Sequence, residues 1–221
     1  CIPPSARGDA KEYGIDGNGE LVSFLLRLRE KGACDLVLHG LSHERSEFLS
    51  EDKEFVQRVL DEALDKFVTT FRFSPRVFVF PYDEGSRVAR QLIASKGLDF
   101  CIVAPFINRV LSKFWIHRSS FRFSGNIIEF FSGNPHFSLL FGFRNEHASI
   151  ELAKRQFLLR YKSDDIFCLS HHYWEFFFDW EERITQQETL RAFNIFLDYV
   201  DKFNIWKCGF TELSQWLIAL N

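Results

Sequence analysis

Two histidines, His39 and His43, lie four residues apart in the sequence HGLSHE, directly after the short apolar run 35–38. If that run is a buried strand, the pair follows its carboxyl end, and a turn of this length can direct two imidazoles at one ion. Neutral imidazole nitrogens are ligands that zinc prefers. The pair therefore predicts a divalent metal site, with Zn²⁺ as the expected ion. Two unrelated histidines on a surface turn are the alternative.

Two other apolar runs are followed by residues that could act in the same chemistry. After 77–80 comes PYDEGS, where a proline precedes Tyr82, and the Tyr82 N–H could donate to a developing oxyanion. After 166–169 comes SHHYW, where His171 or His172 could protonate a leaving group near neutral pH. A buried structural histidine is the alternative for this second pair. Agreement among the three strand ends favours a hydrolytic site.

The elements that must position these residues alternate along the chain. Apolar residues recurring at helical spacing predict helices over 21–30, 50–71, 86–96, 146–161, 185–203 and 211–220. Short apolar runs predict strands over 35–38, 77–80, 100–104, 115–118, 127–131, 166–169 and 205–207. Strands that alternate with helices favour a parallel sheet closed, or nearly closed, into a barrel. In such folds the catalytic groups collect at the carboxyl ends of the strands.

Polar residues are expected at the starts of three helices. Ser50 is the predicted N-cap of the helix 50–71, and Thr211 is the predicted cap of the last helix. Thr185 and Glu188 have the spacing of a capping box. The side chains at these positions would satisfy N–H groups in the first turn, which have no partner inside the helix.

Length and composition fit a single domain over residues 1–221. Hydrophobic residues make up 46% of the chain and charged residues 26%, as in ordinary globular proteins. The net charge of −3 gives no broad cationic field, which excludes nucleic acid as an expected partner. No run approaches the roughly 18 apolar residues of a membrane span, and the start lacks the layout of a signal peptide. Five cysteines without CxxC spacing indicate a reducing compartment, so a cytoplasmic location is expected.

The sequences HGLSH, FPYDEG, CLSHHYW and IWKCGFTELSQWL, in this order, resemble the polysaccharide deacetylase or NodB-homology superfamily of carbohydrate esterases over about the whole chain. The family's H-[ST]-x-x-H motif supplies two metal ligands, which the resemblance assigns to His39 and His43. Its R-x-P-Y motif is matched at Tyr82. Its L-x-H motif, which carries the catalytic acid, is matched at His171, with His172 as the other choice. The implied fold is α/β, a distorted (β/α) barrel of the polysaccharide deacetylase type.

The sequence departs from the family pattern at two places. Val79 stands where the R-x-P-Y motif has its arginine. The family's first strand carries two aspartates, a general base and a third metal ligand, and nothing here matches it. Asp9 and Asp16 lie in an expected loop and are not assigned these roles. We therefore expect the first strand to be missing from this chain, so that this chain binds zinc more weakly than a version extended upstream and releases little or no acetate.

The resemblance implies a metal-dependent hydrolase that removes an acetyl group from a sugar in a surface or cell-wall polysaccharide. Its partner would be an acetylated saccharide. The alternative is a catalytically impaired deacetylase-like module that binds glycan or assists polysaccharide assembly, with Tyr173, Trp174 and Trp180 stacking on sugar rings. A third possibility is another metal-dependent amidase, or a glycoside hydrolase, on a related barrel. Zinc binding with acetate release would distinguish the enzyme from the module.

Overall fold

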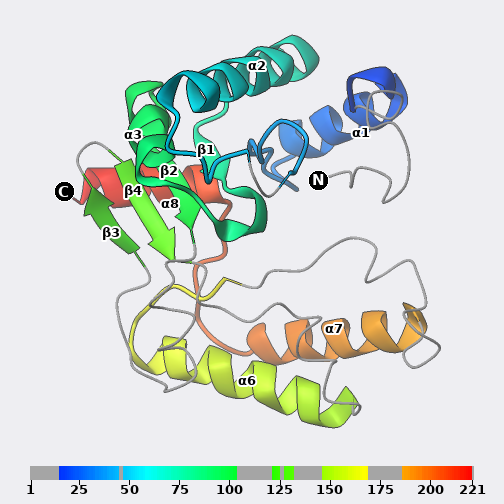
Figure 1. The fold of residues 1–221 in the computed structure, drawn as a ribbon. Coiled ribbons are helices and arrows are strands. Elements are labelled where there is room, and N and C mark those ends of the chain that lie inside the picture. Colours follow the sequence, from blue (N-terminus) through cyan, green and yellow to red (C-terminus); the bar gives the residue numbers. More distant parts are fainter. Residues whose placement is uncertain are drawn as a thin grey trace. The chain divides into compact units, whose positions relative to one another are not determined.

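A computed structural model describes residues 15–44, 47–103, 121–124, 127–131, 146–168 and 186–220. The chain divides into two compact units, and each is described by itself. The first comprises 1–117, 121–131 and 208–221, and the second comprises 118–120 and 132–207 (Figure 1). A single domain over 1–221 stays a prediction.

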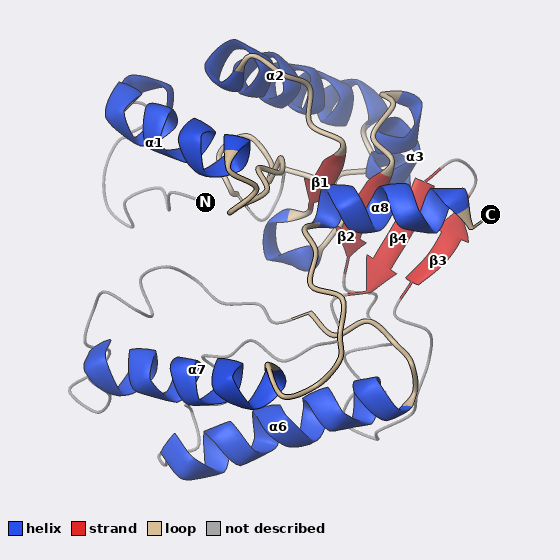
Figure 2. Cartoon of the chain, turned by 180° about the vertical axis from the view of Figure 1, so that it is seen from behind, coloured by secondary structure: helices blue, strands red, loops and turns tan. Residues whose placement is uncertain are grey.

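The first unit contains a four-stranded sheet in the order β1-β2-β4-β3. Its strands are β1 (Val77–Val79), β2 (Phe100–Val103), β3 (Phe121–Ser124) and β4 (Ile127–Phe131). β1, β2 and β4 run parallel, and β3 pairs antiparallel with β4. Helix α8 covers one face of this sheet and α3 lies on the other (Figure 2). In the central strands Cys101, Ile128 and Phe130 are buried, and so is Glu129. The described strands give the predicted mixed α/β fold with a parallel core, and they form a row that does not close into a barrel.

The predicted strand 35–38 is reduced to a single parallel bridge between Leu38 and Phe78. Leu38 N donates to Val77 O at 3.1 Å, and Leu38 O accepts from Val79 N at 2.8 Å. At the start of the run, the residues 35–37 belong to no strand, and the Asp35 carboxylate accepts a hydrogen bond from Thr211 N of α8. The prediction was therefore wrong in extent, but the bridge still places residue 39 beside the end of β1.

The predicted helices are present within a few residues of the expected bounds. In the first unit they are α1 (Gly19–Glu30), α2 (Lys53–Phe71), α3 (Arg87–Ser95) and α8 (Phe210–Ala219), with short 3-10 helices η1 (Ile15–Gly17) and η2 (Pro81–Asp83). In the second unit α6 (Glu146–Lys162) packs along α7 (Gln186–Val200). In the part of the chain that the structure describes, no helix is long and apolar enough to cross a membrane.

Two of the predicted caps were wrong. α2 is capped by Asp52, whose Oδ1 accepts from Glu54 N at 3.0 Å and Phe55 N at 3.1 Å, while Ser50 Oγ accepts from Asp52 N. Gly209, with extended backbone, is the N-cap of α8 in place of the predicted threonine. The predicted cap Thr185 lies outside the described residues.

Two predicted strands, 166–169 and 205–207, are also absent at the positions that the structure describes. The residues 166–168 and 205–207 are described and belong to no strand, so both predictions were wrong for these positions. Phe167 and Ile205 instead pack against the core between α6 and α7, which includes Phe157 and Phe196. Their apolar character therefore reflects burial against helices. The predicted strand 115–118 lies outside the described residues.

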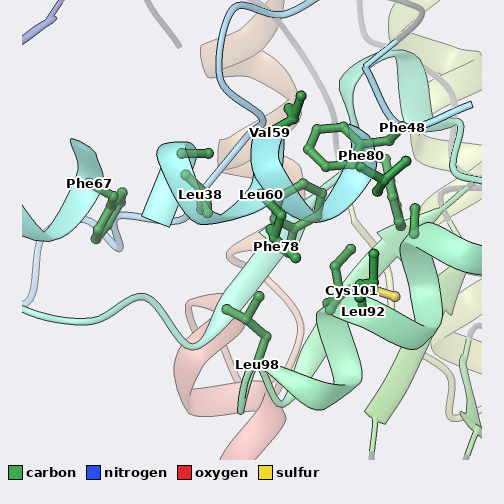
Figure 3. Packing of buried hydrophobic residues seen from close by; sticks show 14 of the residues in the cluster. Leu38, Phe48, Val59, Leu60, Phe67, Phe78, Phe80, Leu92, Leu98 and Cys101 are labelled. Carbon is green, nitrogen blue, oxygen red and sulfur yellow. The ribbon is translucent and has the colours of Figure 1, made fainter. Parts of the chain in front are cut away.

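The core of the first unit holds the segments on both sides of the histidine pair. Leu38 and Phe48 are 5% and 1% exposed and belong to one buried cluster with Phe78 and Phe80 (Figure 3). α2 contributes the buried stripe Val56, Val59, Leu60, Ala63, Phe67 and Phe71. Because burying an aliphatic or aromatic side chain stabilises by roughly 1.5–3 kcal/mol, anchors before residue 39 and after residue 43 restrain the loop between them.

Candidate functional site

Three side chains meet where two neighbouring parallel segments end. His39 follows the Leu38 bridge, and Tyr82 lies in η2, directly after β1. The ring centroids of His39 and His43 are 4.8 Å apart, and those of His43 and Tyr82 are 4.9 Å apart. The structure thus brings together the two predicted metal ligands and the residue of the predicted oxyanion donor.

The His39 ring is oriented by the backbone of β1. Its Nδ1 lies 2.9 Å from Val79 O. A carbonyl oxygen can only accept a hydrogen bond, so this contact requires the proton on Nδ1. In the neutral ring the Nε2 lone pair is then the one that can bind a ligand, which is the arrangement found in histidines that coordinate metals.

Unusual backbone conformations concentrate around these rings. Gly40 has a φ of +77°, His43 of +61° and Tyr82 of +56°. A non-glycine residue in the left-handed region costs about 1–2 kcal/mol, so two of them beside one another require support from the surrounding structure. Of the other such residues that the structure describes, Arg72 terminates α2 and Asp164 lies in the turn after α6.

The site is a surface site built on a rigid base. The Tyr82 side chain is 51% exposed, whereas Phe48, Phe78 and Phe80 below the loops are almost completely buried. The Phe48 ring contacts Phe78 at 5.0 Å and Phe80 at 5.8 Å between centroids. Because three interlocked aromatic rings leave little freedom for repacking, they give the two functional turns a fixed foundation.

Sequence analysis missed one residue of the site, Glu47. Its side chain is buried, with 4% exposure, and it accepts hydrogen bonds from Leu41 N at 3.1 Å and Ser42 N at 2.5 Å. The Ser42 hydroxyl also donates to it. The sequence carries no signal for this burial, because a buried glutamate and an exposed one look the same in it.

The pair of imidazoles fits a divalent ion that takes neutral nitrogen ligands. The rings lie together, and the hydrogen bond at His39 Nδ1 leaves Nε2 as a donor atom. Within the described ranges, no cluster of three histidine, cysteine or acidic side chains surrounds a common point. The described residues thus offer two possible ligands, and the metal site, with zinc as its expected ion, stays a prediction.

His171 and His172, the predicted general acids, lie outside the described residues, as does Asp9. The carboxylate of Asp16 lies 3.2 Å from Lys66 Nζ and so pairs with α2. The general acid therefore stays a prediction.

Comparison with known proteins gives one informative similarity. No family model matches the chain, and no curated protein matches it. Its structure is similar to the crystal structure of a protein from Mycobacterium smegmatis that is provisionally assigned as a polysaccharide deacetylase. The TM-score is 0.64 and the identity 14%, and the match covers 92% of this chain and 69% of that one. At this identity the similarity shows a likeness of fold alone, and the distorted (β/α) barrel of the polysaccharide deacetylase type stays a prediction.

A second solved structure is matched over a smaller part. It is a GH57-type branching enzyme from the hyperthermophilic archaeon Pyrococcus horikoshii, with a TM-score of 0.40 and 17% identity. The match covers 55% of this chain and 25% of that one. It carries no argument about function.

Proposed function

We propose that this protein is a metal-dependent hydrolase that removes an acetyl group from a sugar in a surface or cell-wall polysaccharide, on a distorted (β/α) barrel. The observation that carries the proposal is the convergence of His39, His43 and Tyr82, with centroids 4.8 and 4.9 Å apart, at the ends of two neighbouring parallel segments. Catalytic groups of parallel α/β folds collect at this edge. The similar fold of the M. smegmatis protein supports the same assignment.

The residues below have defined roles in this proposal. The aspartate that the resemblance implies as general base, which would take the proton of the attacking water, is not assigned to a residue of this sequence. A divalent ion, which we expect to be zinc, would be held by His39 and His43 and would polarise the acetyl carbonyl and lower the pKa of a bound water. The Val79 carbonyl oxygen accepts a hydrogen bond from His39 Nδ1, which keeps the ring in an orientation where Nε2 is directed away from Val79. The Tyr82 N–H donates to the oxyanion as it forms. His171 or His172 protonates the departing amine or alkoxide.

The positive φ of Tyr82 bears on its role. A backbone N–H contributes to catalysis only if it is held in place before the reaction, because an unoriented donor must reorganise at the moment of charge development. Tyr82 adopts its left-handed conformation within η2, between Phe80 in the core and the helix cap Ser86. This strained turn is the kind of feature that persists at functional sites.

Acetate release tests the proposal. The full-length protein, with any residues that precede Cys1, is incubated with zinc and with N-acetylated or O-acetylated oligosaccharides, and free acetate is measured by NMR. We expect zinc-dependent release that falls by about a hundredfold or more in His39→Ala, because a ligand to the catalytic ion is lost. His147→Ala, a histidine of α6, is the matched control and should retain activity.

Two results would contradict the proposal. One is acetate release that His39→Ala leaves unchanged, and the other is an absence of release from all acetylated oligosaccharides at saturating zinc. Glycan binding without release would instead support the impaired module, in which the exposed Tyr82 ring beside His43 offers a surface for a sugar.

A further inference from the structure

We propose that Glu47 is a positioning residue that fixes the histidine loop, defined here as residues 39–43, and thereby sets the metal affinity of the site. This inference rests on the proposed function. Glu47 lies four residues after His43 and does not belong to the motif that carries the resemblance. Its side chain nevertheless accepts hydrogen bonds from two residues of the loop, Leu41 and Ser42.

Both oxygens of the Glu47 carboxylate are used on the loop. Oε1 accepts from Ser42 N at 2.5 Å and from the Ser42 hydroxyl, and Oε2 accepts from Leu41 N at 3.1 Å. Among the described residues no lysine or arginine pairs with this carboxylate, so its buried charge is satisfied by loop donors. Hydrogen bonds to an ionised acceptor are about twice as strong as neutral ones. The two loop amides are therefore held toward Glu47.

The loop is also held from the side of Tyr82. A Cβ atom on Gly40 would lie 2.6 Å from Glu47 Oε2 and 2.6 Å from Pro81 Cγ. The Gly40 backbone is therefore packed closely against both the carboxylate and the proline that precedes Tyr82. The carboxylate thus determines how closely the histidine loop approaches the turn that carries the oxyanion donor.

Glu47 is itself held by the core through the next residue. Phe48 is 1% exposed, and its ring contacts Phe78 and Phe80. Its carbonyl oxygen accepts from Ser86 N at 2.7 Å, and Ser86 is the N-cap of α3. Because these contacts of Phe48 fix the position of the Glu47 carboxylate, the hydrogen bonds from Leu41 and Ser42 fix the position of the histidine loop.

Metal affinity depends on ligands being in position before the ion arrives. Supporting residues of this kind typically change metal affinity by about tenfold to a hundredfold when they are replaced. Glu47→Gln keeps the size of the side chain but replaces one acceptor oxygen by an NH₂ group that faces loop donors. The variant should therefore release the loop while leaving the core anchor at Phe48 in place.

The experiment compares zinc affinity, measured by chelator competition, in wild type, Glu47→Gln and Glu129→Gln. Glu129 is the matched control, because it is also a buried carboxylate, with 2% exposure, and its described ion-pair partner is Arg90 of α3. We expect zinc to bind about tenfold to a hundredfold more weakly to folded Glu47→Gln and with wild-type affinity to folded Glu129→Gln. Wild-type affinity in folded Glu47→Gln, or equal weakening in both variants, would overturn the proposal.

Two further measurements cover the remaining outcomes. If Glu47→Gln does not fold, Ser42→Ala takes its place, because this variant removes only the hydroxyl that donates to Glu47. Several-fold weaker zinc binding in Ser42→Ala supports the proposal, and unchanged zinc binding overturns it. If wild type binds no zinc, the proposed function fails, and the imidazole ¹⁵N signals of the metal-free protein decide about Glu47 alone. Changed His39 and His43 signals in Glu47→Gln support its positioning role, and unchanged signals overturn it.

Discussion

Replacing Gly40 by alanine introduces a methyl group where the structure has no room for one. The added Cβ would lie 2.6 Å from Glu47 Oε2, 2.6 Å from Pro81 Cγ and 3.3 Å from Pro81 Cδ. The proline ring is stiff, and the carboxylate is held by loop donors, so neither neighbour can yield easily. Gly40 also has a φ of +77°, which disfavours any residue with a Cβ.

The expected loss of stability has two parts. The left-handed backbone costs alanine about 1–2 kcal/mol. Overpacking against the two neighbours adds about 1–3 kcal/mol. Together Gly40→Ala should lower the free energy of unfolding by about 2–5 kcal/mol, a large share of the roughly 5–15 kcal/mol of an ordinary domain.

Gly97→Ala is the matched control, because Gly97 has a φ of +76° and nothing within 4 Å of its added Cβ. It retains the backbone cost and the change in the unfolded chain, but not the contacts. Urea unfolding of both variants isolates the contact part as the difference, expected to be about 1–3 kcal/mol. Equal destabilisation of the two variants would refute the close packing of Gly40 between Glu47 and the proline.

Three further predictions concern residues around the site. Asp35→Ala should lower the free energy of unfolding by about 1.5–3 kcal/mol in urea, because the carboxylate accepts from Thr211 N at 2.7 Å; an unchanged midpoint would contradict this. Burial and then the Asp35 charge raise the pKa of the Cys34 thiol, so alkylation at mildly alkaline pH, followed by mass spectrometry, should be slower at Cys34 in the native than in the unfolded protein. Faster alkylation in the native protein would contradict the raised pKa. Because the native pKa is the higher one, the contribution of the Cys34 thiol to stability is present below its unfolded pKa and is lost as pH rises through its native pKa. Tyr82→Phe keeps the backbone N–H and the ring, so acetate release should fall by far less than the hundredfold or so that a lost oxyanion donor costs.

The helices could be predicted from the sequence because their signal is local. The stripe from Val56 to Phe71 repeats at helical spacing and is buried as expected in α2. The predicted N-cap of α2, Ser50, was wrong. Ser50 and Asp52 both have side-chain oxygens that accept from backbone N–H groups, and Asp52 is the residue that caps the helix. A local pattern gives the helix, while the competition between neighbouring acceptors is decided only by the folded geometry.

The strands 77–80, 100–104 and 127–131 were predicted to within one residue of β1, β2 and β4. Other apolar runs were wrongly predicted as strands, because a strand needs a partner that the local sequence does not specify. The run 35–38 makes one bridge to Phe78, and Phe167 and Ile205 are apolar because they face a helix pair. The carboxylate that accepts from the first turn of α8 comes from Asp35, which is 176 residues from Thr211 in sequence. No local analysis of α8 could identify that acceptor.

Within the site, the residues that match a family motif could be predicted from the sequence, whereas Glu47, which holds the histidine loop by hydrogen bonds, could not. His39, His43 and Tyr82 were identified from their positions after apolar runs, and the structure brings their rings together. Glu47 was missed because a surface glutamate and a buried one look the same in sequence. Its role follows from burial and from hydrogen bonds to the loop, which only the fold creates.

The central claim is that His39 and His43 bind one divalent ion, and a zinc titration of the metal-free protein tests it most directly. Affinities are compared for wild type, His39→Ala, His43→Ala and the control His147→Ala, with circular dichroism confirming that each variant is folded. We expect one zinc ion per wild-type chain, at least tenfold weaker binding in each loop variant, as ligand loss requires, and wild-type binding in the control. Zinc binding of equal strength in wild type and in both loop variants would contradict the account.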